Sequence, residues 1–194
     1  MMIFKEVIYK LRRKYRSYIF QQRLKNKGGK AGKPLFLSNE QYVVVGNNVR
    51  IKDGYRIECY PHFYKWDYKP KLILEDGVII GHGFTGLVAD TIRIGKNSIF
   101  AGNVTLISEN HGMNPEIDTP YHAQELSTGP IEIGEGCWLG QNVSVLPGVK
   151  IGIKCIIATN AVVTKNIPDY CIAAGSPARI IKKYSFENHK WNKV

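Results

Sequence analysis

The stretch 133–168 reads, in successive sixes, IGEGCW, LGQNVS, VLPGVK, IGIKCI, IATNAV and VTKNIP. The first residue of every six is aliphatic, and the fifth is apolar and mostly small. An α-helix would repeat its apolar residues about every 3.6 positions, and a half-buried strand about every second position. A period of six fits neither, and it predicts short strands joined by tight turns, with one or two side chains of each strand pointing inward.

Earlier parts of the chain carry the same period, at Val45, Ile51, Ile57, Leu74, Ile80, Ile94, Phe100 and Leu106. Three such strands would complete one triangular coil of about 18 residues, and equivalent residues of successive coils would stack about 4.8 Å apart. We therefore expect Cys137 to lie under Cys155, and Ile133 under Ile151. The sequence predicts an all-β solenoid in which each coil contacts only its neighbours.

The composition fits one folded domain with an appendage. Of the 194 residues, 44% are hydrophobic, which is enough to form a core. The chain has no apolar run of the roughly 18–20 residues that span a membrane, and its first residues lack the apolar stretch of a secretory signal. The cysteines show no CxxC spacing, and we expect all of them to be reduced packing residues: Cys59, Cys137, Cys155 and Cys171. These features predict a cytoplasmic protein.

The stretch 131–183, which begins IEIGEGCWLGQNVS, resembles the hexapeptide-repeat acyltransferases, and in particular the sugar and polysaccharide O-acetyltransferases. Residues 178–191, ARIIKKYSFENHKW, are most similar to the capsule and O-antigen branch. The resemblance implies a left-handed parallel β-helix, acetyl-CoA as donor, no metal, and a homotrimer with each site between two subunits. We expect a basic amphipathic helix and linker over 1–33, the β-helix acyltransferase domain with a short cap over 34–184, and a tail over 185–194.

The period fails in three places, and insertions in solenoids often carry function. The first, 60–71, holds five aromatic residues that could stack on sugar rings, or pack against their own coil or a neighbouring subunit. The second, 81–91, has two extra residues, and His82 there is either an acceptor contact or a turn residue. Relatives of the galactoside type carry an asparagine near this point, where this chain has Gly83, so we do not transfer that role.

The third and longest interruption, about 107–130, opens with His111, which matches the histidine that follows the same hexads in the family. Transfer of an acetyl group from a thioester to an alcohol requires a base for the hydroxyl proton, and histidine titrates near neutral pH. The resemblance therefore implies that His111 is the general base. Glu109 and Asn110 stand beside it as candidates to orient its ring in the substrate site, whereas His122 is expected to be a surface residue.

Trp138 follows Cys137 at a position where the repeat directs side chains outward, and an exposed Trp implies a partner surface. In relatives the matching Trp lies at the active cleft, so a functional contact and a purely interfacial role both stay open. The positions that match coenzyme contacts of the family are Gln141, Thr159, Thr164, Lys165, Arg179 and Lys182. The first two would stack along the pantetheine, and the C-terminal cations would meet the phosphates.

The net charge of +11 comes almost entirely from residues 1–33, which hold 11 Lys or Arg against one Glu, or +10. Apolar residues return there at helical spacing: Ile3, Phe4, Val7, Ile8, Leu11, Tyr15, Tyr18 and Ile19. A basic amphipathic helix of this kind could lie on an anionic membrane, bind an acidic glycan or pack on the solenoid. Nucleic acid is a poor fit, because the rest of the chain lacks a recognised binding module.

Together these inferences predict an acetyl-CoA-dependent O-acetyltransferase that acts on a sugar hydroxyl in surface polysaccharide synthesis. An antibiotic O-acetyltransferase of the same fold is an alternative, because it would share the histidine and the coil. A γ-class carbonic anhydrase would need three zinc-binding histidines, two of them in an HxxxxH, which this chain lacks. A serine acetyltransferase would carry a larger N-terminal domain, and a non-enzymatic scaffold is the remaining class.

Overall fold

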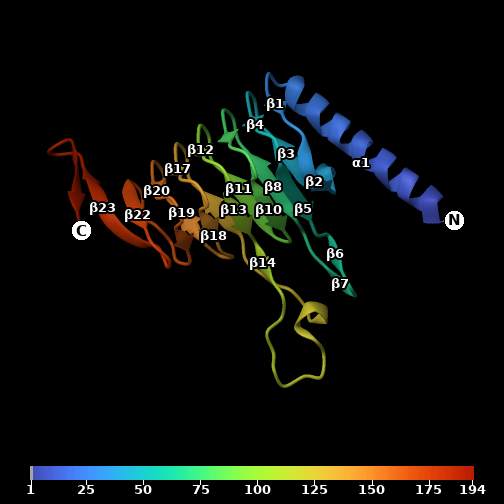
Figure 1. Ribbon diagram of the computed structural model, residues 1–194. Helices are drawn as coiled ribbons and strands as arrows, with labels where there is room; N and C mark the ends of the chain where they lie inside the picture. Colours follow the sequence, from blue (N-terminus) through green and yellow to red (C-terminus); the bar gives the residue numbers. More distant parts are fainter. Residues whose placement is uncertain (1) are drawn as a thin grey trace.

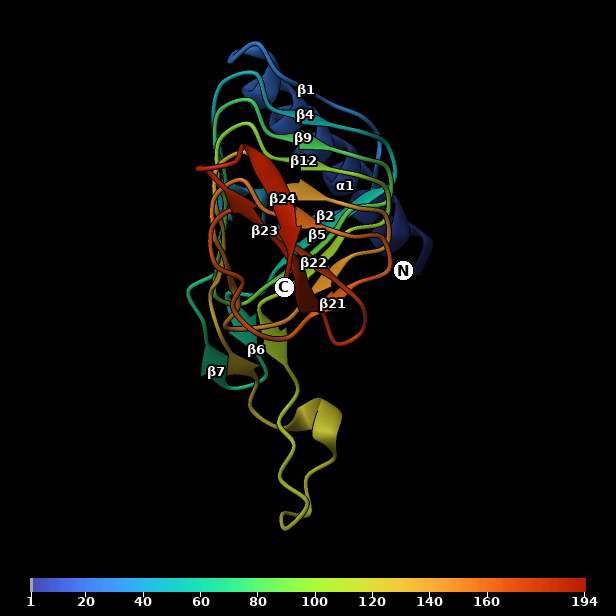
Figure 2. The same cartoon turned by 90° about the vertical axis from the view of Figure 1, so that its left-hand side faces the viewer.

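The computed structural model describes residues 2–194, except for the side chains at positions 2–6, 8–10 and 13. Three sheets form the sides of a triangular prism, and the chain winds around it coil by coil (Figures 1 and 2). Within the coils, each strand pairs in parallel with the equivalent strand of the next coil. The prediction of a parallel β-helix is confirmed.

We call the three sheets face 1, face 2 and face 3, and name each corner by the faces it joins. Face 1 contains β1 (Lys30–Ala31), β4 (Arg50–Ile51), β9 (Ile79–Ile80), β12 (Ile99–Phe100), β17 (Trp138–Leu139), β20 (Ile156–Ile157), β22 (Cys171–Ala174), β23 (Arg179–Ser185) and β24 (Lys190–Lys193). Face 2 contains β2 (Pro34–Ser38), β5 (Tyr55–Cys59), β10 (Thr85–Val88), β13 (Thr105–Ile107), β18 (Ser144–Val145) and β21 (Val162–Val163). Face 3 contains β3 (Val43–Val45), β8 (Lys71–Leu74), β11 (Thr91–Ile94), β16 (Ile131–Ile133) and β19 (Lys150–Ile151).

Equivalent residues of successive coils stack as the period of six predicts. Leu139 pairs with Ile157 on face 1, and Ile133 pairs with Ile151 on face 3. The aliphatic first-position residues of 133–168 point into the prism and are at most 2% exposed. Burial of each such side chain contributes about 1.5–3 kcal/mol, so the repeated columns supply the core of the molecule.

The corner between faces 3 and 1 holds a column of small buried side chains. Ser98 is followed, one coil at a time, by the free thiols of Cys137, Cys155 and Cys171. The Ser98 hydroxyl accepts a hydrogen bond from the Cys137 N–H at 3.1 Å. Cys59, on face 2, is also buried, and this burial raises the pKa of its thiol to about 12. The prediction that the cysteines are packing residues is confirmed.

The corner between faces 1 and 2 is held by a ladder of asparagines. Asn103, Asn142 and Asn160 occupy equivalent turn positions with φ of 58°, 57° and 61°. The side-chain amide of Asn103 donates to that of Asn142 at 3.1 Å, which in turn donates to that of Asn160 at 2.9 Å. Asparagine suits the position because it tolerates the left-handed backbone and can bond to its neighbours in the column.

The insertions in the described coils all lie at the corner between faces 2 and 3. They form a turn with the short helix η1 (Glu40–Tyr42), a hairpin with β6 (His62–Phe63) and β7 (Trp66–Asp67), a two-residue expansion before β11, and the loop 108–130. The register Gly86↔Leu106 puts the two extra residues of the second interruption after Gly86. His82 therefore lies at a different corner, in a turn of ordinary length between faces 1 and 2.

The N-terminal segment forms the expected helix, α1 (Met2–Lys25), and this helix packs across the first coil. Phe20 and Leu24 are fully buried against the coil, and the Phe20 ring lies 6.1 Å from that of Tyr55. The predicted apolar residues Ile3, Phe4 and Ile8 have side chains outside the described set. The first strand, β1, lies inside the segment expected to be a linker and pairs with β4.

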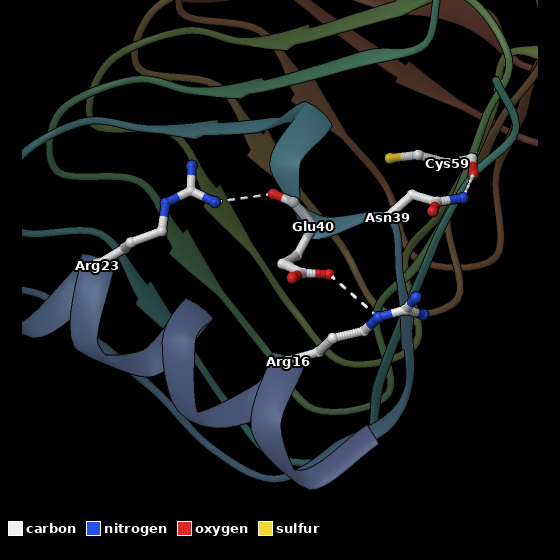
Figure 3. A network of polar contacts seen from close by, with 5 residues as sticks. All are labelled: Arg16, Arg23, Asn39, Glu40 and Cys59. Atoms are coloured by element: carbon white, nitrogen blue, oxygen red, sulfur yellow. Dashed lines mark hydrogen bonds and ion pairs between the residues drawn. The ribbon is translucent and has the colours of Figure 1, made fainter. Parts of the chain in front are cut away.

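Polar side chains near the end of α1 donate to backbone carbonyl oxygens on the open edge of the first coil. The pairs are Gln21 with Gly32 at 3.1 Å, Arg23 with Glu40 at 2.8 Å and, just beyond the helix, Lys27 with Val45 at 2.8 Å. Figure 3 shows Arg23 with Glu40, whose carboxylate also lies 3.8 Å from Arg16. These contacts give the edge oxygens of the first coil the partners that another coil would supply.

An antiparallel hairpin closes the opposite end of the prism. β23 pairs with β22 and then with β24, so the segment expected to be a tail contributes a strand. Aromatic rings join the hairpin to the last coil, since Phe186 lies 4.8 Å from Tyr170 and 5.1 Å from Tyr184. Trp191 completes the cluster at 5.3 Å from Tyr184. These ring contacts explain why the last residues are ordered on the prism.

Two substitutions test the asparagine ladder. Asn142→Ala removes two side-chain hydrogen bonds and leaves a β-carbon in the left-handed region, so we expect a loss of about 2 kcal/mol of unfolding free energy. Asn142→Gly removes the same bonds without the backbone penalty and is expected to lose roughly 1 kcal/mol less. Urea unfolding of both variants measures the difference, and equal losses would contradict the role of the backbone conformation.

Candidate active site

A buried serine fixes the point at which the loop 108–130 leaves the prism. Ser108 directly follows β13 and is fully buried. Its hydroxyl accepts hydrogen bonds from the N–H groups of Ala89 and Asp90, at 3.0 and 3.1 Å, and donates to the Leu87 carbonyl at 3.2 Å. The exit is thereby tied to the two-residue expansion in the adjacent coil. The sequence did not reveal this role of Ser108, because a single serine at a coil exit forms no recognisable pattern.

The three predicted residues of the loop follow in order from this anchor. β14 (Glu109–Asn110) pairs in antiparallel fashion with β15 (Ser127–Thr128), and His111 comes next, with its side chain exposed. Burial raises the pKa of Glu109, an effect that the neighbouring His111 partly opposes. Among the described side chains, neither Glu109 nor Asn110 makes a hydrogen bond to the His111 ring, so their predicted roles stay predictions.

The hairpin of the first interruption packs against the loop of the third. The ring of Phe63 lies 5.6 Å from that of His111, tilted by 50°. The Leu126 N–H donates to the Tyr68 hydroxyl at 3.0 Å, on the return side of the loop. The hairpin therefore contacts both the histidine ring and the return side of the loop, an arrangement that the sequence did not predict.

One glutamine holds the far part of the loop in shape. Gln124 is buried, and its amide oxygen accepts from the Asn114 N–H at 3.0 Å. Its amide nitrogen donates to the carbonyls of Asn114 at 2.9 Å and Thr119 at 2.8 Å. These bonds join the two limbs of the loop, so residues 112–125 form a wall with a defined shape.

A cleft of about 810 Å³ opens between the hairpin and the loop, directly after His111. Its hairpin side is formed by Tyr64, Lys65 and Trp66, and its loop side includes Gly112, Met113 and Gln124. The Lys65 ammonium lies 5.1 Å from the centre of the Trp66 ring. The cleft thus combines aromatic surface with polar groups, and its lining on the loop side begins at Gly112, the residue after the exposed His111.

Part of the predicted coenzyme set lies at the same corner as His111. Thr164 and Lys165 follow β21, just as the loop that carries His111 follows β13. The register Leu106↔Val145↔Val163 places β21 two coils beyond β13, which is about 10 Å along the prism. Both side chains are exposed. Arg179 and Lys182 follow on β23, whose start is tied to face 2 by the Ala178 N–H, which donates to the Val162 carbonyl at 2.8 Å.

The other predicted residues lie elsewhere on the prism. Gln141 and Thr159 stack at the corner between faces 1 and 2, where the register of β9, β12, β17 and β20 also puts His82. Trp138 is 53% exposed on the outer side of face 1, so its predicted outward direction is confirmed. Face 1 lies opposite the corner that carries His111. A single chain therefore does not bring Trp138 or Gln141 to His111.

Trp138 belongs to an apolar column on the outer side of face 1. In register with it stand Ile79, Ile99, Ile156 and Ile172, one in each neighbouring coil. Ile79 and Ile99 are 36% and 44% exposed. Ile156 and Ile172 are half-buried, and the exposed part of the column, with Trp138 beside Ile99 and Ile79, is typical of a surface that another molecule covers.

The remaining histidines are separate from one another. His62 contacts Asp67 across the hairpin, and His122 is exposed in the short helix η2 (Tyr121–Ala123) of the loop. Where side chains are described, no three His, Cys, Asp or Glu residues gather as metal ligands would.

Known proteins resemble this chain in sequence. A family model described as bacterial transferase hexapeptide (six repeats) matches residues 130–165. The putative lipopolysaccharide biosynthesis O-acetyl transferase WbbJ of Escherichia coli K12 is 29% identical over 167 residues, which cover 83% of this chain and 82% of that protein. The galactoside O-acetyltransferase of Escherichia coli K12 is 37% identical over 107 residues, and the match spans 52% of this chain and about half, 51%, of that enzyme.

Solved structures share the fold. AntD, an N-acyltransferase from Bacillus cereus in complex with dTDP and 3-hydroxybutyryl-CoA, superposes with a TM-score of 0.63 at 20% identity, over 87% of this chain and 90% of that one. At this identity the likeness concerns the fold alone. Solved hexapeptide-repeat acetyltransferases wind in the same way, so the prism is the left-handed parallel β-helix that the sequence resemblance implied. The family model over 130–165, the shared fold and the named relatives together show that the chain is similar to the hexapeptide-repeat acyltransferases.

Proposed function

We propose that this protein transfers an acetyl group from acetyl-CoA to a sugar hydroxyl during synthesis of a surface polysaccharide, with His111 as general base. The observation that carries the proposal is the position of His111, exposed at a coil exit beside a cleft with aromatic walls. The relative WbbJ is named for lipopolysaccharide biosynthesis, which supports a polysaccharide precursor as acceptor.

The reaction needs one proton transfer in each direction. His111 takes the proton of the acceptor hydroxyl as its oxygen attacks the thioester carbonyl, and a tetrahedral oxyanion forms. The C–S bond then breaks, and the same proton passes to the departing sulfur, which leaves the acetyl ester and free coenzyme thiol. The cysteines are all buried and the Ser108 hydroxyl is engaged with backbone groups, so direct transfer fits better than an acyl-enzyme.

The cleft after His111 suits a saccharide. Tyr64 and Trp66 offer flat apolar faces that can stack on the faces of sugar rings, and the polar groups beside them can bond to hydroxyls. The Phe63 ring supports the His111 ring from the same hairpin. In this arrangement the acceptor lies between hairpin and loop, with one hydroxyl at His111.

The coenzyme would run from His111 toward the C-terminal end of the prism. Thr164 and Lys165 follow at the same corner, and Arg179 and Lys182 add cations at the end, where the phosphates would lie. The AntD structure contains an acyl-CoA, which supports a coenzyme A thioester as donor for this fold. We assign the reaction to the cytoplasm, where acetyl-CoA is available.

A complete site would need a second copy of the chain. Trp138, Gln141 and Thr159 lie away from His111 within one chain, and the apolar column around Trp138 is exposed. A homotrimer, in which face 1 of one subunit meets the His111 corner of the next, would bring them together and cover the column. His82, at the same corner as Gln141, would then approach the site from the neighbouring subunit.

His111→Ala is expected to lower acceptor-dependent release of coenzyme thiol by about 10²–10⁴-fold, because the variant loses the group proposed to take the hydroxyl proton. The assay follows free thiol with acetyl-CoA and a panel of nucleotide sugars, oligosaccharides and drug alcohols. His122→Ala, in the same loop, serves as the matched control with near-normal activity. An unchanged rate in His111→Ala would contradict the proposed base, and turnover restricted to a drug alcohol would indicate an antibiotic acetyltransferase.

Trp66→Ala is expected to raise the KM for the saccharide acceptor roughly tenfold, because one stacking surface is lost. The KM for acetyl-CoA and the kcat should stay near wild type, since Trp66 lies on the acceptor side. Tyr121→Ala is the control, because it removes an exposed aromatic ring from the neighbouring loop, outside the lining of the cleft. Steady-state kinetics at varied acceptor concentration measures the effect, and a change in the acetyl-CoA KM alone would contradict the assignment of the cleft.

Co-expression tests whether sites form between subunits. The variants His111→Ala and Trp138→Ala are each expected to be impaired when expressed alone. Mixed trimers contain sites with an intact histidine from one subunit and an intact tryptophan from the next, so doubly tagged mixed assemblies should regain a measurable part of the activity. If purified mixed assemblies are no more active than the single variants, the two residues do not act in one shared site.

A further inference from the structure

One face of the helix α1 is buried against the first coil, and the opposite face is exposed. Phe20 and Leu24 are buried on the first coil, and Arg23 is hydrogen-bonded to backbone oxygens of the same coil. The other face carries Val7, Leu11, Tyr15 and Tyr18, which we call the apolar stripe. Successive members are four, four and three residues apart, a spacing that keeps them on one side of a helix.

The apolar stripe is exposed along its whole length. Val7, Leu11, Tyr15 and Tyr18 are 48%, 60%, 66% and 56% exposed. The C-terminal end of α1 meets the first coil near β1, and the N-terminal end points away from the prism (Figure 1). Four large apolar side chains in one line on the surface are typical of a site that contacts an apolar partner.

Cations accompany the stripe and are not neutralised by the fold. Arg12 and Lys14 are exposed and make no ion pair with any described side chain. Arg16, by contrast, is used internally, opposite Glu40 (Figure 3). The segment 1–33 has a net charge of +10, whereas the other 161 residues, with 16 basic and 15 acidic side chains, have +1. The helix is therefore the positive end of a nearly neutral body.

We propose that α1 binds the surface of an anionic lipid bilayer, with the apolar stripe at the level of the acyl chains and the flanking cations among the headgroups. This is the arrangement of an interfacial helix, which lies in the plane of the membrane. Tyrosines such as Tyr15 and Tyr18 suit the interface, because the ring is apolar and the hydroxyl is wet. Over the described residues, no helix is long and apolar enough to span a membrane.

Charge and shape favour a bilayer over the other occupants. An acidic glycan would account for the cations but not for four exposed apolar side chains in line. A second copy of the helix would account for the stripe, but it would bring two strongly positive segments together. An anionic bilayer matches both the stripe and the charge, and it is the only one of the three that does so.

The experiment uses the full chain and sedimentation with vesicles. One set of vesicles is phosphatidylcholine alone, and the other contains roughly one third phosphatidylglycerol. The protein should sediment with the anionic vesicles and remain in the supernatant with the neutral ones, and added salt should release it. Binding to neither kind of vesicle, or equal binding to both, would overturn the proposal.

Two double variants separate the stripe from the charge. Leu11→Gln with Tyr15→Gln keeps helix-forming residues but removes the centre of the stripe, and Arg12→Gln with Lys14→Gln removes the exposed cations. Each is expected to lower vesicle partitioning at least about tenfold, because the two contributions act together. Tyr121→Gln with Phe186→Gln removes similarly exposed aromatics elsewhere and should partition like the wild type.

Further readouts distinguish the alternatives. Circular dichroism and acetyl-CoA turnover of the stripe variant should be unchanged, because the stripe lies outside the proposed site. If the stripe variant keeps its vesicle binding, the stripe does not face the lipid. If its sedimentation velocity shows a smaller assembly than the wild type, the stripe joins two copies instead. Retention on a sulfated polysaccharide without any vesicle binding would identify the acidic glycan as the ligand.

Discussion

The whole molecule depends on the parallel stacking of equivalent residues, one coil on the next. Each strand donates and accepts backbone hydrogen bonds with its neighbours, and each inward side chain rests on its counterpart, as Leu139 does on Ile157. A residue must therefore fit the one above and the one below, which explains why small groups line one corner and asparagines another. The period of six in the sequence results from this geometric requirement.

This constraint also decides where function can arise. A strand cannot gain a residue without shifting its column, but a corner can, provided that the next strand starts in register. Here the extra residues leave between faces 2 and 3, and Ser108 ties the largest insertion back to the adjacent coil. The rigid prism thus holds His111 in place, while the hairpin and the loop shape the cleft beside it.

The periodic part of the structure could be predicted from the sequence, and the aperiodic part could not. The coils, the buried columns, the outward Trp138 and the packing role of the thiols all follow from counting in sixes. Counting does not reveal contacts between insertions, so the approach of Phe63 to His111 and the bracing by Gln124 were missed. It also did not show that His82 and His111 occupy different corners, because two extra residues can be accommodated at either side of Gly86.

The side chains of Gln21, Arg23 and Lys27 end the first coil by occupying its free carbonyl oxygens. An uncovered first coil would be an open edge to which strands of another molecule could add, and such pairing leads to aggregation. The N-terminal helix therefore acts as a cap that prevents further strands from adding to the first coil. The exposed apolar stripe lies on the other side of this helix, so the molecule's resistance to aggregation and its attachment to other structures depend on two faces of one helix.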